Sequence, residues 1–371
     1  MPVSSAFRTT KPDQTMRSRR LLGINSDKSC CYYHCLSRLI EKRFLFGEQQ
    51  RELFRKVMRQ QEAFSGVRVL TWTCLSNHFH LLLGVEDKEG EHATKVKAQL
   101  MRDDEAFLSR LAHLYEPKAL EEVEKLLGAI RKGKASPEEK EKQIAKLKQP
   151  YLNRMYDLSC FVGEIKQRLS QWYNLRNGRS GPLWEDRFKS VLVQGEPGLL
   201  AMVAAYIDLN AVRAGIVKEP RDWRWSGYAE AAAAQSRARE GLYEALGESG
   251  ESSSDGGSWR RVHQRYRSLL MHEGVQRRDE EGRVVRKGLS PEEFEAQEAL
   301  GFELPNRALL HHRIRYFTDG LVLGSVGFVE EVFRQKKRKL GVKRKVGPRV
   351  PRLDGLGGLR TLKDLRGEVT G

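Results

Sequence analysis

Two histidines stand on either side of a phenylalanine in the segment NHFHLLLG, residues 77–84. If this apolar run is a strand, alternate side chains point to opposite faces of the sheet. His78 and His80 then share one face, while Phe79 and Leu81 share the other. A pair of imidazoles on one face can hold a metal ion, or it can be two ordinary residues at a sheet surface. The rest of the chain has to decide between these interpretations.

A tyrosine and an asparagine in the segment AYIDLNAVRAG offer a nucleophile and a third metal ligand. Tyr206 and Asn210 are four residues apart, a spacing that places both side chains on one face of a helix. They lie beside an apolar stripe formed by Leu200, Val203, Ile207, Ala211 and Ala214. A tyrosine with only a packing role would more naturally lie within that stripe. Taken alone, however, the pair is still better explained as a half-buried tyrosine and a solvent-exposed asparagine.

The composition favours a nucleic-acid partner. The 371 residues include 66 Lys and Arg against 49 Asp and Glu, which gives a formal net charge of +17. Such a basic balance suits a polyanion. No apolar run is long enough to span a membrane and the chain begins with basic, polar residues, so we expect a cytoplasmic protein without membrane contact. The five cysteines form no C-x-x-C pair and are expected to be reduced.

Hydrophobic periodicity predicts a small antiparallel α/β sandwich. The expected order is strand, helix, strand, strand, and then, after a charged helical insertion at about 88–150, helix, strand and helix. Pro197 and Gly215 are typical of the start and end of the last helix. The predicted elements lie at 31–38, 47–64, 66–75, 78–85, 158–177, 181–194 and 195–215.

The chain divides into five expected parts. A basic tail at 1–25 precedes the main domain at 26–245. A linker rich in Gly and Ser at 246–258 leads to a helical extension at 259–345, and a basic tail at 346–371 follows.

The extension carries a concentrated basic run. Helix signals predict one helix from Ser290 and Pro291 and another over 324–341. Between Arg334 and Arg349 there are nine Lys or Arg and no acidic residue. So dense a charge favours contact with phosphates over a merely solvated tail, and makes the extension a candidate DNA-binding part. The residues expected to make these contacts are Lys336, Lys337, Arg338, Lys339, Lys343, Arg344 and Lys345.

Four ordered segments, NHFHLLL, GRSGPLWEDRFKS, AYIDLNAVRAGIV and DWRWSGY, together resemble the REP-associated tyrosine transposases, which are single-tyrosine HUH transposases. The resemblance covers roughly residues 30–230 and is interrupted by the insertion. It implies an α+β fold with a ferredoxin-like or RRM-like antiparallel sheet, helices on one face, the helical insertion and a small helical C-terminal extension. One departure is Ala211 after Asn210, where the family commonly has Asn-Pro.

The resemblance also implies roles for the candidate residues. His78 and His80 match the metal pair, Tyr206 matches the nucleophile, and Asn210 matches the polar residue that completes the metal shell. The expected cofactor is a divalent metal, Mg²⁺ or Mn²⁺, and the expected partners are single-stranded or hairpin DNA and a second copy of the chain. Attack by the tyrosine would leave a 5′-phosphotyrosine and a free 3′-hydroxyl. Because one phosphodiester replaces another, no ATP is needed.

DNA contacts are also expected within the main domain. Arg187 and Lys189, two apart on a predicted strand, share a face and could follow a phosphate backbone. Arg213, near the helical face of Tyr206, is expected to contact the strand that is cut. Three aromatic residues could stack on unpaired bases, although core packing is the more common role: Trp172, Tyr173 and Trp184.

Two other functions fit the sequence. A relaxase-like nickase would use related chemistry, but no helicase motif follows the core. A non-catalytic protein could bind single-stranded nucleic acid on an RRM-like sheet, with the histidines as relics. The presence of Tyr206 together with both histidines favours the transposase over this second alternative.

Overall fold

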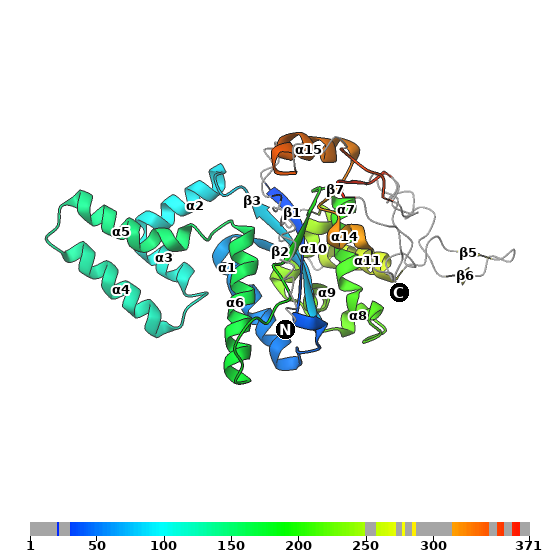
Figure 1. Ribbon diagram of the computed structural model, residues 1–371, viewed down its shortest axis with the longest axis horizontal. Helices are drawn as coiled ribbons and strands as arrows, with labels where there is room; N and C mark the ends of the chain where they lie inside the picture. Colours follow the sequence, from blue (N-terminus) through cyan, green and yellow to red (C-terminus); the bar gives the residue numbers. More distant parts are fainter. Residues whose placement is uncertain are drawn as a thin grey trace, which may run out of the picture.

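The computed structural model describes residues 21, 30–248, 257–271, 277–278, 284–286, 314–340, 347–351 and 358–363. Its main feature is a six-stranded sheet with the order β2-β3-β1-β4-β7-β8 (Figure 1). The strands are β1 (Cys30–Arg38), β2 (Arg68–Cys74), β3 (His78–Glu86), β4 (Lys189–Val193), β7 (Val322–Gly324) and β8 (Arg360–Thr361). All neighbours pair antiparallel except β4 and β7, which are parallel. The α+β class predicted from the sequence is confirmed.

Helices α1 (Glu48–Ser65) and α6 (Leu158–Arg176) pack side by side on one face of the sheet. Together with the first four strands they form the sequence β1-α1-β2-β3-α6-β4, in which β1 lies between β3 and β4 as in a ferredoxin-like sandwich. The core on this side contains Phe79, whose ring centre lies 4.8 Å from that of Phe54 in α1. The apolar side chains on one face of the strands thus pack against the apolar faces of the two helices in a single layer.

A second helical layer covers the other face. Helix α7 (Pro197–Asp208) is buried at every position from Gly198 to Asp208, because other helices surround it. An all-round apolar helix is typical of the interior. The neighbours are α8 (Asn210–Arg213), α9 (Gly227–Ala232), α10 (Ser236–Leu246) and α11 (Gly257–Met271). Two 3₁₀ turns occupy Ile40–Lys42 and Pro220–Asp222.

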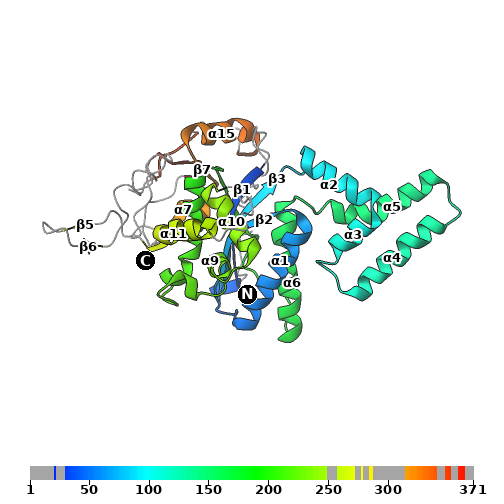
Figure 2. The same cartoon turned by 180° about the vertical axis from the view of Figure 1, so that it is seen from behind.

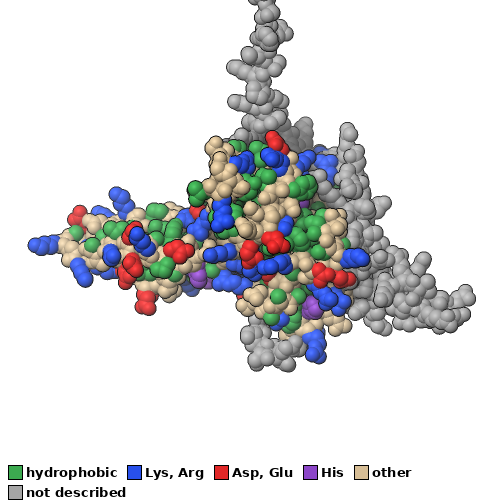
Figure 3. Space-filling view, turned by 90° about the horizontal axis from the view of Figure 1, so that it is seen from below, with side chains coloured by type: hydrophobic (Ala, Val, Ile, Leu, Met, Phe, Trp, Pro, Cys, Tyr) green, Lys and Arg blue, Asp and Glu red, His purple; other side chains and the backbone are tan. Residues whose placement is uncertain are grey.

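The insertion forms a helical arm that projects from the body of the protein (Figures 1 and 2). It has its own core, and the buried Lys148 ties its helices together by donating to the carbonyls of Leu100 and Met101 at 2.8 and 3.0 Å. Lys and Arg side chains alternate with Asp and Glu over its surface (Figure 3). Its helices are α2 (Glu91–Arg102), α3 (Asp104–Leu111), α4 (Pro117–Lys132) and α5 (Pro137–Leu152).

The C-terminal part contributes strands as well as helices. The Leu192 and Gln194 amides each donate at 2.9 Å to carbonyls of the segment around β7, so this short strand extends the main sheet. Helix α15 (Val326–Leu340) matches the helix expected over 324–341, and α14 (Arg315–Asp319) precedes β7. A small hairpin pairs β5 (Arg277–Arg278) with β6 (Val284–Arg286). The helix expected from Ser290 lies outside the described residues.

No helix within the described ranges is both long enough and apolar enough to cross a membrane.

Candidate functional site

The two histidines of β3 face the α7 layer. Strand β3 pairs with both β1 and β2, which places His80 opposite Leu36 on one side and Thr73 on the other. Phe79 lies in the opposite core, as strand alternation predicts. His80 is only 3% exposed and His78 is partly exposed at the start of the strand. The sheet therefore presents both rings on the same side, with their centres 5.1 Å apart.

A third histidine holds the ring of His80. The Nε2 atom of His34 in β1 lies 2.8 Å from Nδ1 of His80, and Nδ1 of His34 lies 2.7 Å from the carbonyl oxygen of Phe317. A carbonyl can only accept, so Nδ1 of His34 carries a proton. Burial lowers the pKa of His34 to about 4, which keeps its ring neutral at pH 7.

These hydrogen bonds determine the tautomer of His80. Neutral His34, protonated on Nδ1, offers a lone pair at Nε2, so Nδ1 of His80 must donate to it. Burial and the neighbouring rings of His34 and His78 lower the pKa of His80 well below its ordinary value. Nε2 of His80 is then unprotonated, which is the state required of a metal ligand. His78 is oriented similarly, since its Nδ1 lies 2.5 Å from Oδ1 of Asn77.

Tyr206 comes to the same place from α7. Its ring centre lies 6.3 Å from that of His80 and 6.1 Å from that of His34. The guanidinium carbon of Arg213 lies 4.0 Å from the centre of the Tyr206 ring, and Nη2 of Arg213 donates to the Tyr206 carbonyl at 2.8 Å. The structure thus brings together a phenol, a cation and two imidazoles from four elements, α7, α8, β1 and β3.

Helix α14 covers this group. The Phe317 ring stands at 90° to the Tyr206 ring with a centre-to-centre distance of 5.0 Å. Lys189 at the start of β4 forms an ion pair of 2.6 Å with Asp319 at the end of α14. With this cover in place, Tyr206 is 2% exposed.

Asn210 is buried one helical turn beyond Tyr206. It begins α8, and the backbone hydrogen bond from Arg213 to Leu209 keeps the helical path continuous across the boundary with α7. The side chain is 8% exposed, and its Nδ2 has no hydrogen-bond partner among the described residues. A buried donor without a partner is uncommon, but Nδ2 can only donate, so any metal would have to be bound by Oδ1 of the same amide.

The ligand types fit a divalent metal only if Asn210 takes part. Within the described ranges, no group of three or more His, Cys, Asp and Glu could hold a metal ion. His34 cannot supply the third ligand, because its 2.8 Å hydrogen bond to His80 leaves no space for an ion between the two rings. Two imidazoles and an amide oxygen are suitable ligands for Mn²⁺, whereas Mg²⁺ prefers oxygen.

Comparisons with known proteins add one distant likeness. No family model matches the chain, and no curated protein matches it. A solved structure of a REP-associated tyrosine transposase bound to a REP hairpin is similar, with a TM-score of 0.31 and 15% sequence identity over 55% of this chain and 79% of that chain. At this TM-score the likeness carries no argument about this chain.

The expected DNA-binding residues lie in different settings. Arg187 precedes β4 instead of lying within it, so the expectation that Arg187 and Lys189 alternate on one strand is wrong. Both side chains are exposed, and Lys189 is paired with Asp319. In the basic run, Lys336 is described, whereas the side chains of Lys337, Arg338 and Lys339 and the whole of Lys343, Arg344 and Lys345 lie outside the described residues.

The aromatic residues of α6 and the following loop pack mainly into the protein. The ring centre of Trp184 lies 5.5 Å from that of Phe79, and its Nε1 donates to Ser170 Oγ at 2.9 Å. Tyr173 is buried in the same core. Trp172 and Trp184 are both partly exposed, and Trp172 lies beneath Arg176. Core packing, the commoner role for such residues, accounts for Trp184 and Tyr173.

Sequence reasoning missed His34 and Phe317 as parts of the site. Alternation in CYYHCLSR shows that Tyr32, His34 and Leu36 share a face. That signal does not say which face of the sheet it is, because this depends on the pairing of β1 with β3. Phe317 is separated from His34 by 283 residues, and no local pattern connects them.

Proposed function

We propose that this protein is a metal-dependent endonuclease and strand transferase of the HUH tyrosine transposase type. It would cleave and rejoin single-stranded DNA, with hairpin-bearing repeats as its substrate. The observation that supports this best is the placement of Tyr206 beside His80, 6.3 Å apart between ring centres, in a region that also holds Arg213. A phenol that lies beside a guanidinium group and oriented imidazoles is suited to act as a covalent nucleophile.

In the proposed reaction, Tyr206 Oη attacks a backbone phosphorus of a single strand. A P–O bond forms to the tyrosine and the P–O bond to the 3′ oxygen breaks, while the phenol releases its proton to solvent and the leaving 3′ oxygen takes up one proton from solvent. The products are a 5′-phosphotyrosine and a 3′-hydroxyl, and a second 3′-hydroxyl reverses the step to rejoin DNA. Arg213, whose guanidinium carbon lies 4.0 Å from the centre of the Tyr206 ring, would offset negative charge on the attacked phosphate.

A divalent metal would be held by His78, His80 and Asn210, and when bound it would offset negative charge on the attacked phosphate. His34 keeps Nε2 of His80 unprotonated for that purpose. Asn77 has the same role for His78: its Oδ1 lies 2.5 Å from Nδ1 of His78, which leaves Nε2 of His78 for the metal.

The proposal requires α14 to move. Tyr206 is 2% exposed, and the ring of Phe317 lies against it. A phosphodiester can reach the buried hydroxyl only if a covering group moves, and the proposal assigns this movement to Phe317 and α14 on DNA binding. The ion pair between Lys189 and Asp319 would be broken or exchanged in that movement.

The test incubates the full-length protein with labelled single-stranded hairpin DNA from beside its own gene, with Mn²⁺, with Mg²⁺ and with a chelator. Wild-type protein should give a covalent protein–DNA adduct on a denaturing gel only with metal. Tyr206→Phe should bind the DNA and form no adduct. The matched control is Tyr173→Phe, which removes a hydroxyl from the opposite core and should leave the adduct unchanged. An adduct that persists in Tyr206→Phe would rule out this nucleophile.

The burial of Tyr206 favours one other function, a non-catalytic protein that binds single-stranded nucleic acid. In that case α14 would stay in place, and wild-type protein would bind the hairpin without forming an adduct under any metal condition. The same gel, read beside a binding curve, separates the two functions.

A further inference from the structure

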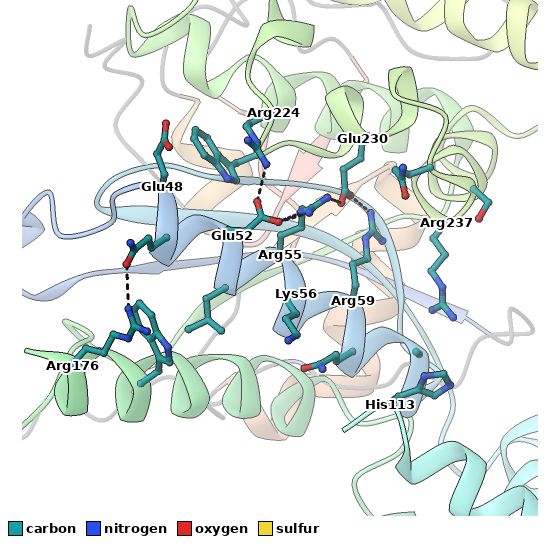
Figure 4. A pocket seen from close by; sticks show the side chains of 18 residues that line it. Glu48, Glu52, Arg55, Lys56, Arg59, His113, Arg176, Arg224, Glu230 and Arg237 are labelled. Atoms are coloured by element: carbon teal, nitrogen blue, oxygen red, sulfur yellow. Dashed lines mark hydrogen bonds and ion pairs between the residues drawn. The ribbon is translucent and has the colours of Figure 1, made fainter. Parts of the chain in front are cut away.

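A hollow of about 1100 Å³ lies along the outer side of α1 (Figure 4). Helix α1 packs its inner side against the core that contains Phe79, so the hollow is on the other side of the sheet from His80 and Tyr206. Its walls come from α1, α6, the segment before α9, α9 itself, the start of α10, and the turn after α3 that carries His113. None of these residues takes part in the site described above.

Ion pairs already neutralise two of the three carboxylates in the hollow. Glu52 pairs with Arg55 and, at 3.1 Å, with Arg224. Glu230 pairs with Arg59 and also accepts a 2.8 Å hydrogen bond from Nε1 of Trp72 in β2. This network holds the guanidinium groups in fixed positions along α1, as the dashed contacts in Figure 4 show.

Other cations face the hollow without such partners. Lys56 and Arg237 are exposed, and neither side chain forms an ion pair or hydrogen bond with another described residue. Arg176 lies 4.8 Å from the ring centre of Trp172 and donates to Gln49 Oε1 at 3.4 Å, so its partners are uncharged. The remaining carboxylate is Glu48. The hollow therefore has an excess of positive charge, and part of that charge is not used by the fold.

We infer that this hollow binds the phosphate backbone of DNA that flanks the cleaved strand. The inference rests on the proposed function, because that function supplies DNA as the partner. Guanidinium groups held by a salt-bridge network are preorganised for phosphate oxygens. Trp172, the partly exposed aromatic residue in the walls, adds surface of the kind that unpaired bases stack on. An open hollow walled by several elements suits a polymer better than a small ion.

The route between the two sites runs around the edge of the sheet. Strand β2 is the outermost strand on that side, and Ser226 pairs with Thr73 along it. The segment that follows, α9 and α10, contacts both β2 and α7, the helix that carries Tyr206. DNA leaving the candidate site past this edge would meet Arg224, Arg237 and Lys56 next.

The test compares two double variants of the full-length protein. Lys56→Gln with Arg237→Gln removes the unpartnered charges of the hollow. The matched control, Lys125→Gln with Lys142→Gln, removes two exposed lysines from the arm, each next to a glutamate in the sequence. Binding of a fluorescent single-stranded hairpin DNA is measured by anisotropy across a range of salt concentrations.

The hollow variant should bind about tenfold more weakly or worse near 0.1 M salt, and the slope of log K against log salt should fall by about 1.4 because two phosphate contacts are lost. The control should keep the wild-type slope. Equal slopes for the two variants overturn the inference. Equal competition by polyglutamate and by unlabelled DNA would also overturn it, because the hollow would then bind any polyanion.

The two proposals fail in different ways. If wild-type protein forms no covalent adduct but the hollow variant loses DNA binding, the function proposal fails and the binding surface stands. If the adduct forms and the hollow variant binds like wild type, only the binding surface fails. Thermal unfolding of each variant checks that it remains folded, as expected for substitutions of exposed side chains.

Discussion

The 2.8 Å hydrogen bond between His34 Nε2 and His80 Nδ1 makes a candidate metal ligand depend on the C-terminal segment. Its donor and acceptor roles are set by the Phe317 carbonyl, 2.7 Å from the other nitrogen of His34. A hydrogen bond that orients a ligand and fixes its tautomer usually matters almost as much as the ligand itself. His34 is thus a positioning residue in the proposed site.

Two substitutions of His34 separate positioning from packing. Glutamine can accept from His80 with its oxygen and donate to Phe317 with its nitrogen, whereas phenylalanine fills similar space and does neither. We expect His34→Phe to weaken Mn²⁺ binding by roughly 10- to 100-fold, and His34→Gln to retain most of the affinity, by calorimetric titration. Nitrogen NMR of the metal-free protein should show His80 protonated on Nδ1 in wild type. Mn²⁺ affinity unchanged in His34→Phe would contradict this role.

Phe317 offers a second test, because it covers Tyr206. Phe317→Ala should raise the initial rate of adduct formation, since less contact must be broken to expose the phenol. The matched control is Phe64→Ala, which truncates another buried phenylalanine, in the core of the arm. Both variants should lose stability, roughly 3–5 kcal/mol for a fully buried phenylalanine, but only the first should react faster. A slower reaction in Phe317→Ala would mean that α14 supports catalysis instead of blocking it.

Local patterns predicted most of the elements but not how they meet. The strands at 31–38 and 78–85 and the helices at 47–64 and 158–177 follow from short-range periodicity, and the structure has them within a few residues. Strand β7 has three residues and joins β4 from about 130 residues away, so no local signal could reveal it. The apolar stripe expected beside Tyr206 is not a separate face of the helix. Other helices, including α14, surround α7, so all of its faces are buried.

The site was predictable to a similar degree. Alternation placed His78 and His80 on one face, and the spacing of four placed Asn210 one turn from Tyr206. Contacts of His34 and Phe317 depend on strand register and on a chain segment far away in sequence. Local patterns can indicate such residues only after the sheet order is known.

Asp208, two residues beyond Tyr206, predicts a pH dependence of stability. Its carboxylate accepts hydrogen bonds from Thr71, Tyr266 and the Tyr228 amide, but complete burial outweighs these donors and raises its pKa to about 7. A raised pKa means that the folded state holds the proton more tightly than the unfolded state. The stabilisation is therefore complete below the ordinary pKa near 4 and is lost as the pH rises through about 7.

Asp208→Asn removes this titration while keeping the size of the side chain. Relative to wild type, the variant should gain about 2–3 kcal/mol of unfolding free energy between pH 5 and pH 8. Urea unfolding at several pH values measures the difference, and subtraction cancels the contributions of His34 and His80, which are common to both proteins. A difference that does not vary with pH would show that Asp208 is ionised throughout.

Phe79 and His78 are adjacent in β3 and face opposite layers, so substituting them should affect different properties. Phe79→Ala should lower stability, and His78→Ala should abolish the reaction. Phe79 is fully buried between Phe54 and Trp184, with ring centres at 4.8 and 5.5 Å. Phe79→Ala should therefore lower the free energy of unfolding by about 3–5 kcal/mol and leave Mn²⁺ affinity unchanged in the protein that stays folded.

His78 is partly exposed, so His78→Ala should change stability by less than about 1 kcal/mol. It should instead abolish metal-dependent adduct formation, because a proposed ligand is gone. Denaturant unfolding and Mn²⁺ titration on the same preparations give both quantities. If His78→Ala keeps the wild-type adduct rate, the proposed metal site on β3 is wrong, and His78 is only a partly exposed residue at the start of the strand.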